Sequence, residues 1–553
     1  MGFRNTAIYQ DMTPVLLFAA VFSSMGAFTF GYDNNWWGGV MGARHFNLTF
    51  GSGTKVENGQ TIRWMNANDQ SAGTALGTAG IMLGCMIAPF INERYGRKAS
   101  FMSLAVIAIV GSIIMACSTI KSSFWMLVAG KIIVNSSVGI ASAVTGVYQS
   151  ECSPHRIRGA LTNAYTVFNN TGTLLANIVM FGVHSKTNAS VWLVPIGLQF
   201  LFPIIILCVT PFLPESPRWL VAQGRNEDAF FQLRRLRGSK ASDETLTNEL
   251  QEVIDSLEHE RENQSKYGWL QLFRGQDLRR TLVACGMLCL QQGQGISFTN
   301  NYLNITMLNL GFTNTYELLV ALYVGKLVIT FVGFYLPDRV GRRPMVLVGS
   351  CFMGSCMFIM AAIATATNNK PTGSLGSLTL ASIFIWVFTY SPTWGSLPWT
   401  TAAEISSQQL RAKTLAVAAW AGYAVGLINN LVVPYIQQPQ YGNLQGQITY
   451  IFGGFSVVAV VLSYFFLPEL KGRTLEELDM LYEANVPARK FASYDLSAIK
   501  AERAAQNPHS HAEKEGSVFD LDNKPKDDKI IAYSIAFVNS QDGRGERRDV
   551  QYK

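Results

Sequence analysis

Charged residues are scarce in this sequence. Only 15% of its 553 residues are Asp, Glu, Lys or Arg, while 49% are hydrophobic. A soluble protein carries about 25% charged residues, so the composition indicates an integral membrane protein that has the lipid bilayer as a partner. The net charge of +7 forms no basic stripe with interleaved aromatics, which argues against a nucleic-acid partner.

Catalytic and metal-binding patterns are also missing. The 8 Cys and 6 His are scattered, and no pair has metal-ligand spacing, so the cysteines are expected to be small buried hydrophobes. No nucleophile–base set and no phosphate-binding loop is present. We therefore expect no enzyme, no metal and no cofactor.

Long apolar runs are abundant instead. About twelve of them reach the roughly 20 residues that a helix needs to cross a hydrocarbon core of about 30 Å. The predicted fold is an all-α membrane protein of twelve transmembrane helices in two six-helix halves. Its expected parts are a cytoplasmic N-terminus (1–13), a first half (14–213), a partly helical cytoplasmic loop (214–280), a second half (281–474) and a disordered cytoplasmic tail (475–553).

Basic residues sort onto alternate loops, among them ERYGRK, PHRIRG, DRVGRR and QLRAK. The positive-inside rule places these loops and both termini in the cytoplasm. The sequons at Asn47 and Asn188 then lie outside, where they are candidate glycosylation sites. Outer sequons favour the plasma membrane as the location.

The two halves repeat a set of charged motifs. ERYGRK at 93–98 recurs as DRVGRR at 338–343, the Glu151/Arg158 pair recurs as Glu404/Arg411, and PESPR at 214–218 recurs as PELKGR at 468–473. These charges could fix topology alone, but acidic partners at a fixed spacing favour a cytoplasmic gate that pairs charges across the halves. The gate candidates are Glu93, Arg94, Arg97, Glu151, Arg158, Glu215, Arg218, Asp338, Arg339, Arg342, Arg343, Glu404, Arg411 and Glu469.

Seven motifs in order resemble the sugar porter family of the major facilitator superfamily. They are ERYGRK, the segment from Glu151 to Gly159, LPESPRWL, QQGQG, DRVGRRP, the segment from Trp394 to Glu404, and PELKGRT. The sequence is similar to a divergent, fungal-type member. The resemblance implies alternating access to a central sugar site, with the charged residues above as the cytoplasmic gate.

A sugar site needs hydrogen-bond donors and acceptors beside a flat apolar face. The stretch QQGQGISFTNNY (291–302) brings several amides into a membrane segment, more than the bonding of helices to one another would require. The resemblance implies that Gln291 and Gln292 bind the sugar and that Trp399 stacks under it. The other substrate-binding candidates are Ser297, Asn301, Thr166, Asn169 and Tyr423.

Asp33 is the acidic residue expected well inside the first span. A buried carboxylate beside a cation is a candidate proton carrier. The resemblance implies a partner on the fourth helix, which here is Lys131. Proton symport is favoured over a purely structural Asp33–Lys131 bridge.

Lys326 interrupts an otherwise apolar run, where an unpaired charge is costly. At about 1.5 Å per residue it is roughly 14 Å from Glu317 and 18 Å from Asp338, too far for direct pairing. It could bind the carboxylate of a sugar acid such as galacturonate, lose its proton, or bond a neutral sugar from a wet cavity. The neutral mono- or oligosaccharide is the favoured substrate.

A non-transporting sugar sensor would share the pocket and the gate. It would signal through the tail, in which no repeated docking motif is visible. We therefore expect a monomeric transporter that imports its sugar with a proton. Trp36 and Trp37 could form part of a lid or of a sugar platform, but they are expected in the outer aromatic belt.

Overall fold

The computed structural model describes residues 12–57, 60–154, 157–238, 241–266, 268–407, 409–473 and 475–496. The chain divides into two compact units, Met1–Ser493 and Tyr494–Lys553. All the elements discussed below lie in the first unit.

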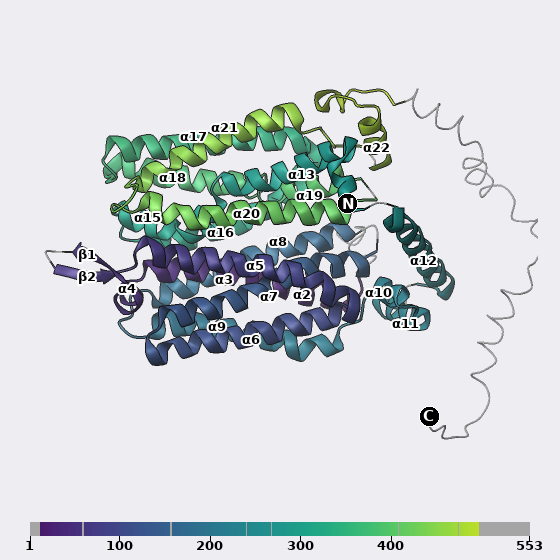
Figure 1. Cartoon of the computed structure of the whole chain (residues 1–553), viewed down its shortest axis with the longest axis horizontal. Coiled ribbons are helices and arrows are strands. Elements are labelled where there is room, and N and C mark those ends of the chain that lie inside the picture. Colours follow the sequence, from purple (N-terminus) through teal and green to yellow (C-terminus); the bar gives the residue numbers. More distant parts are fainter. Residues whose placement is uncertain are drawn as a thin grey trace, which may run out of the picture. The chain divides into compact units, whose positions relative to one another are not determined.

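The first half consists of long helices that run between two ends of the bundle (Figure 1). Its helices are α2 (Pro14–Ser23), α3 (Met25–Gly42), α5 (Ala67–Tyr95), α6 (Arg97–Lys121), α7 (Phe124–Cys152), α8 (Arg158–Val183) and α9 (Ser190–Val209). After α3 come the short helix α4 (Arg44–Phe50) and an antiparallel hairpin of β1 (Gly53–Glu57) and β2 (Gln60–Trp64). We call this end of the bundle the hairpin end.

The segment between the halves is helical and lies at the opposite end, which we call the loop end (Figure 1). It contains η2 (Thr210–Phe212), α10 (Pro217–Ala222), α11 (Asn226–Arg237), α12 (Asp243–Lys266) and η4 (Trp269–Phe273). Arg237 of α11 donates to the Cys152 carbonyl and pairs with Glu249 of α12. These bonds tie the segment to the end of α7.

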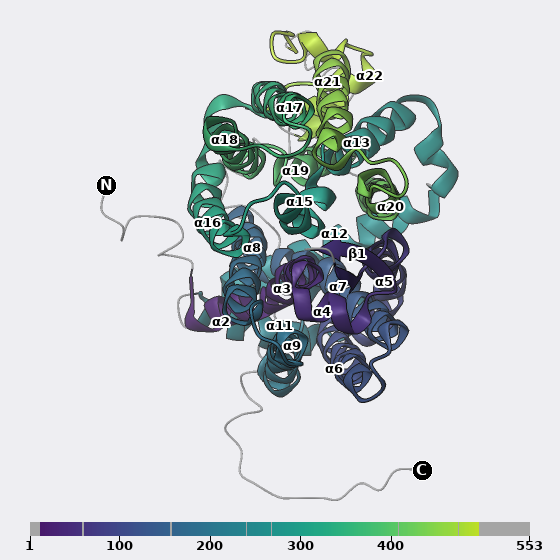
Figure 2. The same ribbon diagram turned by 90° about the vertical axis from the view of Figure 1, so that its left-hand side faces the viewer.

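The second half packs beside the first, as the view from the hairpin end shows (Figure 2). Its helices are α13 (Gly275–Gly293), α14 (Ile296–Asn301), α15 (Leu303–Asn309), α16 (Thr315–Val340), α17 (Arg342–Ala366), α18 (Gly373–Tyr390), α19 (Leu397–Ile405), α20 (Arg411–Gln437), η5 (Gln445–Ile448) and α21 (Thr449–Phe466). The halves meet where α5 packs on α20 and α8 packs on α16.

Ten helical segments of the described residues are long and apolar enough to cross a membrane. The segments α8 and α13–α15 are not among them, although they lie in the same bundle. Both carry amides, and the second is interrupted at Gly295, where φ of 103° favours glycine. The all-α fold in two halves is confirmed, and the predicted count of twelve spans would need these two polar segments in addition to the ten.

The tail departs from its prediction. Residues 475–553 were expected to be disordered, but α22 (Leu475–Glu483) and η6 (Ala488–Lys490) form at its start. Leu481 and Phe491 are fully buried, and Asp479 pairs with the buried Arg280 of α13. The prediction is wrong for this stretch, because its apolar residues recur at helical spacing and cover the end of α13.

Helices α3 and α8 pack closely through glycine. A Cβ on Gly31 would lie 1.9 Å from the Asn169 carbonyl oxygen, and one on Gly172 would lie 2.1 Å from the Phe28 oxygen. Real Cβ atoms do not approach that closely, so a side chain at either position separates the two helices. This contact fixes α8, which carries part of the interface between the halves.

We predict that Gly31→Ala lowers the free energy of unfolding by about 1–3 kcal/mol, the usual cost of overpacking. Thermal unfolding of the detergent-solubilised protein measures it. The control is Gly182→Ala in α8, the helix that Gly31 of α3 packs against, because nothing lies within 4 Å of the added Cβ. Equal midpoints for the two variants would contradict the close α3–α8 contact.

Candidate functional site

Hydrogen bonds between the halves concentrate at the hairpin end. Asn430 of α20 donates to Thr78 of α5 at 2.9 Å, and Ser71 donates to the Leu431 carbonyl at 2.8 Å. The Tyr302 hydroxyl, which bonds the Asn430 carbonyl at 2.8 Å, also contacts the Thr74 hydroxyl. A membrane interior offers no water for these groups, so the bonds stabilise closure of the halves at this end.

A small pocket lies beside α13, α19 and α20. Its empty volume is about 170 Å³, and it is lined by Leu288, Gln291, Gln292, Trp399, Ala419, Gly422 and Tyr423. Four predicted substrate-binding residues therefore share one pocket. The space in it that a water-sized sphere can enter is only about 10 Å³, far below the roughly 300–1,000 Å³ of small-molecule pockets, so a ligand of sugar size would require the halves or the side chains to move apart.

The two glutamines of this pocket differ in their contacts. Gln291 donates to the Trp394 carbonyl at 2.6 Å, across the break between α18 and α19. Gln292 accepts from the Ser297 hydroxyl at 2.9 Å, while its Nε2 has no recorded hydrogen bond to the described residues. Gln291 thus shapes the pocket wall, and Gln292 keeps a donor available for a ligand.

Four other substrate candidates do not line this pocket. Asn301 donates to Asn430 at 3.3 Å, and Asn169 donates to the Ala27 carbonyl at 3.4 Å. Thr166 is half-buried in α8. None of Ser297, Asn301, Thr166 and Asn169 is among the residues that line the pocket.

Two amides of α20 were missed from the sequence. Asn430 bonds across the halves, and Asn429 donates to the Gln292 carbonyl at 2.8 Å. Adjacent asparagines inside an apolar run were the available signal, since polar groups in a membrane span must find partners.

A buried charge pair occupies the core of the first half. Lys131 lies 3.2 Å from Asp33, and both side chains are almost fully buried. Gln199 of α9 donates to the other Asp33 oxygen at 2.9 Å and accepts from the Trp36 indole at 3.0 Å. The sequence predicted that Asp33 pairs with Lys131, but it did not identify Gln199 as a further partner.

Trp36 and Trp37 belong to this core. Both are fully buried, and the Lys131 ammonium lies 4.7 Å from the Trp37 ring centroid. The prediction of an outer aromatic belt is therefore wrong. The rings instead enclose the lysine, whose charge a π face stabilises.

Lys326 lies on the face of α16 that turns toward the first half. Its side chain is 9% exposed, and its ammonium lies 5.4 Å from the Tyr323 ring centroid. Thr330, one turn further, accepts from Asn170 of α8 at 2.8 Å. The opposite face of α16, with Val324 and Val328, is exposed.

The loop-end charges form the same arrangement twice. Arg97 pairs with Glu151 at 2.7 Å and donates to the Asn92 carbonyl at 3.0 Å. Arg342 pairs with Glu404 at 3.2 Å and donates to the Pro337 carbonyl at 3.0 Å. Both of these pairs lie within one half, and the expected pairing across the halves stays a prediction.

Two further glutamates hold the starts of α6 and α17. Glu215 accepts from the Arg97 and Lys98 amides at 3.1 and 3.2 Å, and Glu469 accepts from the Arg342 and Arg343 amides at 3.0 and 3.1 Å. These carboxylates satisfy helix N-termini. Burial raises the pKa of Glu215, although the backbone donors lower it.

The other gate candidates have varied surroundings. Glu93 and Arg94 are exposed, and Arg218 is half-buried. Arg343 donates to the Tyr464 carbonyl at 2.8 Å, and the exposed Arg339 accepts from Lys471 at its carbonyl. Arg411 is half-buried, with two guanidinium nitrogens lacking hydrogen-bond partners. The side chains of Arg158 and Asp338 lie outside the described part of the chain.

The two sequons differ in accessibility. Asn47 is fully buried, and its amide nitrogen donates to the Met41 and Ala43 carbonyls. The folded chain has no room for a glycan there, so the prediction for Asn47 is wrong. Asn188 is exposed after α8.

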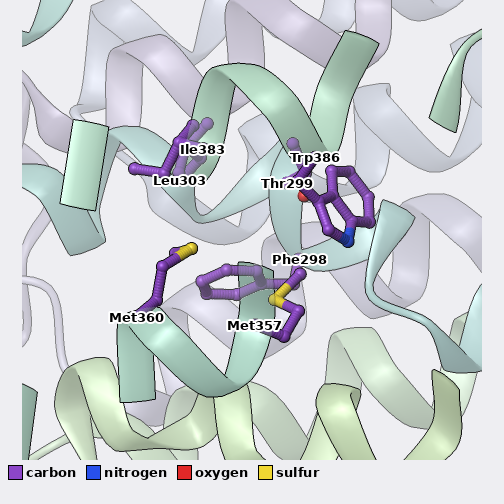
Figure 3. Close-up of a pocket in the computed structure, with 7 residues that line it drawn as sticks. All are labelled: Phe298, Thr299, Leu303, Met357, Met360, Ile383 and Trp386. Atoms are coloured by element: carbon purple, nitrogen blue, oxygen red, sulfur yellow. The ribbon is translucent and has the colours of Figure 1, made fainter. Parts of the chain in front are cut away.

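A second pocket lies within the second half (Figure 3). It has an empty volume of about 210 Å³ and is lined by Phe298, Thr299, Leu303, Met357, Met360, Ile383 and Trp386. This lining is almost entirely apolar. It therefore does not suit a ligand covered with hydroxyl groups.

Two helical halves that share a polar interface, with a pocket beside it and a buried charge pair in one half, define a membrane transporter fold rather than an enzyme. A family model described as "Sugar (and other) transporter" matches residues 19–482. The chain belongs to this family.

Two similar fungal proteins illustrate the family. The high glucose sensor RGT2 of Saccharomyces cerevisiae is 30% identical over 84% of this chain, which spans 60% of the length of that relative. The high-affinity glucose transporter of Kluyveromyces lactis is 29% identical over 78% of this chain and 80% of its own length.

Solved structures show the same fold. The xylose transporter XylE from E. coli, in a partially occluded inward-open conformation, superposes with a TM-score of 0.69 at 22% identity, covering 84% of this chain and 100% of that one. The likeness confirms the major facilitator fold.

We predict that Arg97→Met lowers the free energy of unfolding by about 3–5 kcal/mol, because it leaves the buried Glu151 carboxylate without its partner. The matched control is Arg225→Met, which breaks the exposed Arg225–Asp228 pair and should cost less than about 1 kcal/mol. Thermal unfolding in detergent measures both. Similar losses for the two variants would contradict a structural role for the Arg97–Glu151 pair.

Proposed function

We propose that this protein is a sugar transporter that works by alternating access and imports a mono- or oligosaccharide with a proton. The observation that carries the proposal is the pocket of Gln291, Gln292, Trp399 and Tyr423 beside the interface of the halves. Amides provide both donors and acceptors for sugar hydroxyls, and the indole provides an apolar face.

The arrangement at the hairpin end supports alternating access. Hydrogen bonds join α5 to α20 there, whereas the Arg97–Glu151 and Arg342–Glu404 pairs at the loop end each hold one half together. Rocking of two rigid halves breaks the hydrogen bonds between α5 and α20 and leaves the charge pairs within each half intact. We propose that Glu215 and Glu469 keep each half rigid during this motion.

The buried charge pair supports proton coupling. Asp33 is held by Lys131 and Gln199, and the Lys131 ammonium is also enclosed by aromatic rings. A carboxylate in this position exchanges its lysine partner for a proton when the charge pair separates. Proton binding to Asp33 thereby changes the contacts that hold α3 against α7 and α9.

The orientation and location extend the proposal. The basic loop end faces the cytoplasm, with both termini on that side, and the hairpin end faces outward. Asn188 is then the accessible glycosylation site. The protein acts as a monomer in the plasma membrane.

A second candidate function is that of a sugar sensor. The high glucose sensor RGT2 is 30% identical to this chain, and a sensor would keep the pocket without net transport. Binding of sugar by the purified protein, with no uptake by cells or by proteoliposomes, would favour the sensor over the transporter.

We predict that Gln292→Ala raises the KM for sugar uptake about 2- to 10-fold, the loss expected for one or two hydrogen bonds. Uptake of labelled glucose, cellobiose and galacturonate by transport-deficient cells measures it. The control is Gln251→Ala, on the exposed surface of α12. An unchanged KM in Gln292→Ala would contradict the proposed sugar site.

We predict that Asp33→Asn abolishes accumulation of sugar against its gradient while sugar exchange continues. The amide keeps the shape of the carboxylate but carries no proton in the transport cycle. Wild-type uptake should fall when a protonophore is added, and the Asn variant should not respond to it. Wild-type uptake that is insensitive to the protonophore would contradict Asp33 as the coupling acid.

A further inference from the structure

Lys326 differs from the other buried charged residues of the described chain. The buried charged side chains are Asp33, Asp69, Lys131, Arg280 and Lys326. Asp33 pairs with Lys131, Arg280 pairs with Asp479, and Asp69 accepts from Ser52 and Asn66. For Lys326 the described residues provide neither a counter-ion nor a hydrogen-bond partner, and its recorded contact is with the Tyr323 ring.

The lysine lies one helical turn from a hydrogen bond between the halves. Thr330 donates to the Lys326 carbonyl at 2.8 Å and lies 3.0 Å from the Ser391 hydroxyl. The same hydroxyl of Thr330 receives the amide of Asn170 from the first half. The turn of α16 that carries Lys326 therefore adjoins a polar seam of three helices, α8, α16 and α18.

This polar seam continues to the sugar pocket. Ser391 begins the break between α18 and α19, and the Trp394 carbonyl in that break accepts from Gln291. The same short irregular segment is thus contacted by Thr330, one turn from Lys326 in α16, and by Gln291 from α13. A ligand between the halves can contact both Lys326 and Gln291.

An ammonium in this position needs an anion. Asp33, the acid expected in the membrane interior, is already held by Lys131 and Gln199. A neutral sugar would leave the charge of Lys326 uncompensated, while a carboxylate would form a charge-assisted hydrogen bond in a site with little water.

We propose that Lys326 binds the carboxylate of the transported substrate and that the substrate class is a sugar acid, such as a hexuronate. This inference rests on the proposed transport function and defines its substrate. Gln292 and Trp399 then contact the hydroxyl groups and the ring of the same molecule, and Lys326 selects the acid over the parent sugar.

The test compares galacturonate with galactose, which differ at C6 by a carboxylate in place of a hydroxymethyl group. Binding is measured as ligand-induced thermal stabilisation of the purified full-length protein, and transport as uptake into proteoliposomes. The variants are Lys326→Met and Lys326→Arg. The control is Lys370→Met, which removes an exposed lysine between α17 and α18.

We expect the wild type and Lys370→Met to bind galacturonate at least about tenfold more tightly than galactose, the advantage of a charge-assisted hydrogen bond. Lys326→Met should lose this preference and still bind galactose, and Lys326→Arg should retain part of it. The retained galactose binding shows that the Met variant is folded.

Equal affinity of the wild type for the two ligands, or an unchanged preference in Lys326→Met, overturns the proposal. In that case Lys326 is neutral or hydrogen-bonds a neutral sugar. Because binding is measured apart from uptake, galacturonate binding without transport would contradict the transport function and leave the role of Lys326 supported. Galactose transport without a preference for galacturonate would support the transport function and contradict the proposed role of Lys326.

Discussion

The rest of this structure depends on the requirement that polar groups inside a membrane find partners within the protein. The requirement explains why Asp33, Lys131 and Gln199 converge on one point, and why the carbonyl groups at the α18–α19 break are bonded by Gln291. It also explains the closure of the hairpin end, where Asn430 bonds Thr78 of the other half. We propose that these contacts are exchanged for a proton, a sugar hydroxyl or another helix during transport.

The same turn occurs in both halves at the loop end, with a glycine at its centre and a glutamate bonded to it. Gly96 and Gly341 adopt positive φ angles, and Glu215 and Glu469 receive the amides that follow them. A Cβ on Gly341 would lie 2.7 Å from the Glu469 carboxylate, so the tight turn and the bonded glutamate require each other. We propose that these turns keep each half rigid, so that motion occurs at the contacts between the halves.

Much of the fold follows from the sequence. Apolar length predicts the two sets of helices, and the repeated charges predict the matching pairs Arg97–Glu151 and Arg342–Glu404. The direction in which a residue of a membrane helix points does not follow, because lipid and protein interior are both apolar. For this reason Trp36 and Trp37 were expected at the surface. For the same reason the sequence did not identify Gln199 as a partner of Asp33 or Asn429 as a partner of Gln292.

The proposed alternating access must change the distance between exposed positions of the two halves. Spin labels on Asn188→Cys and Lys370→Cys, which lie after α8 and α17, measure this distance in a cysteine-depleted protein. Saturating galactose or galacturonate should change the relative populations of a short and a long distance, as the bonds around Asn430 break and reform. A single distance that no ligand and no pH alters would contradict alternating access.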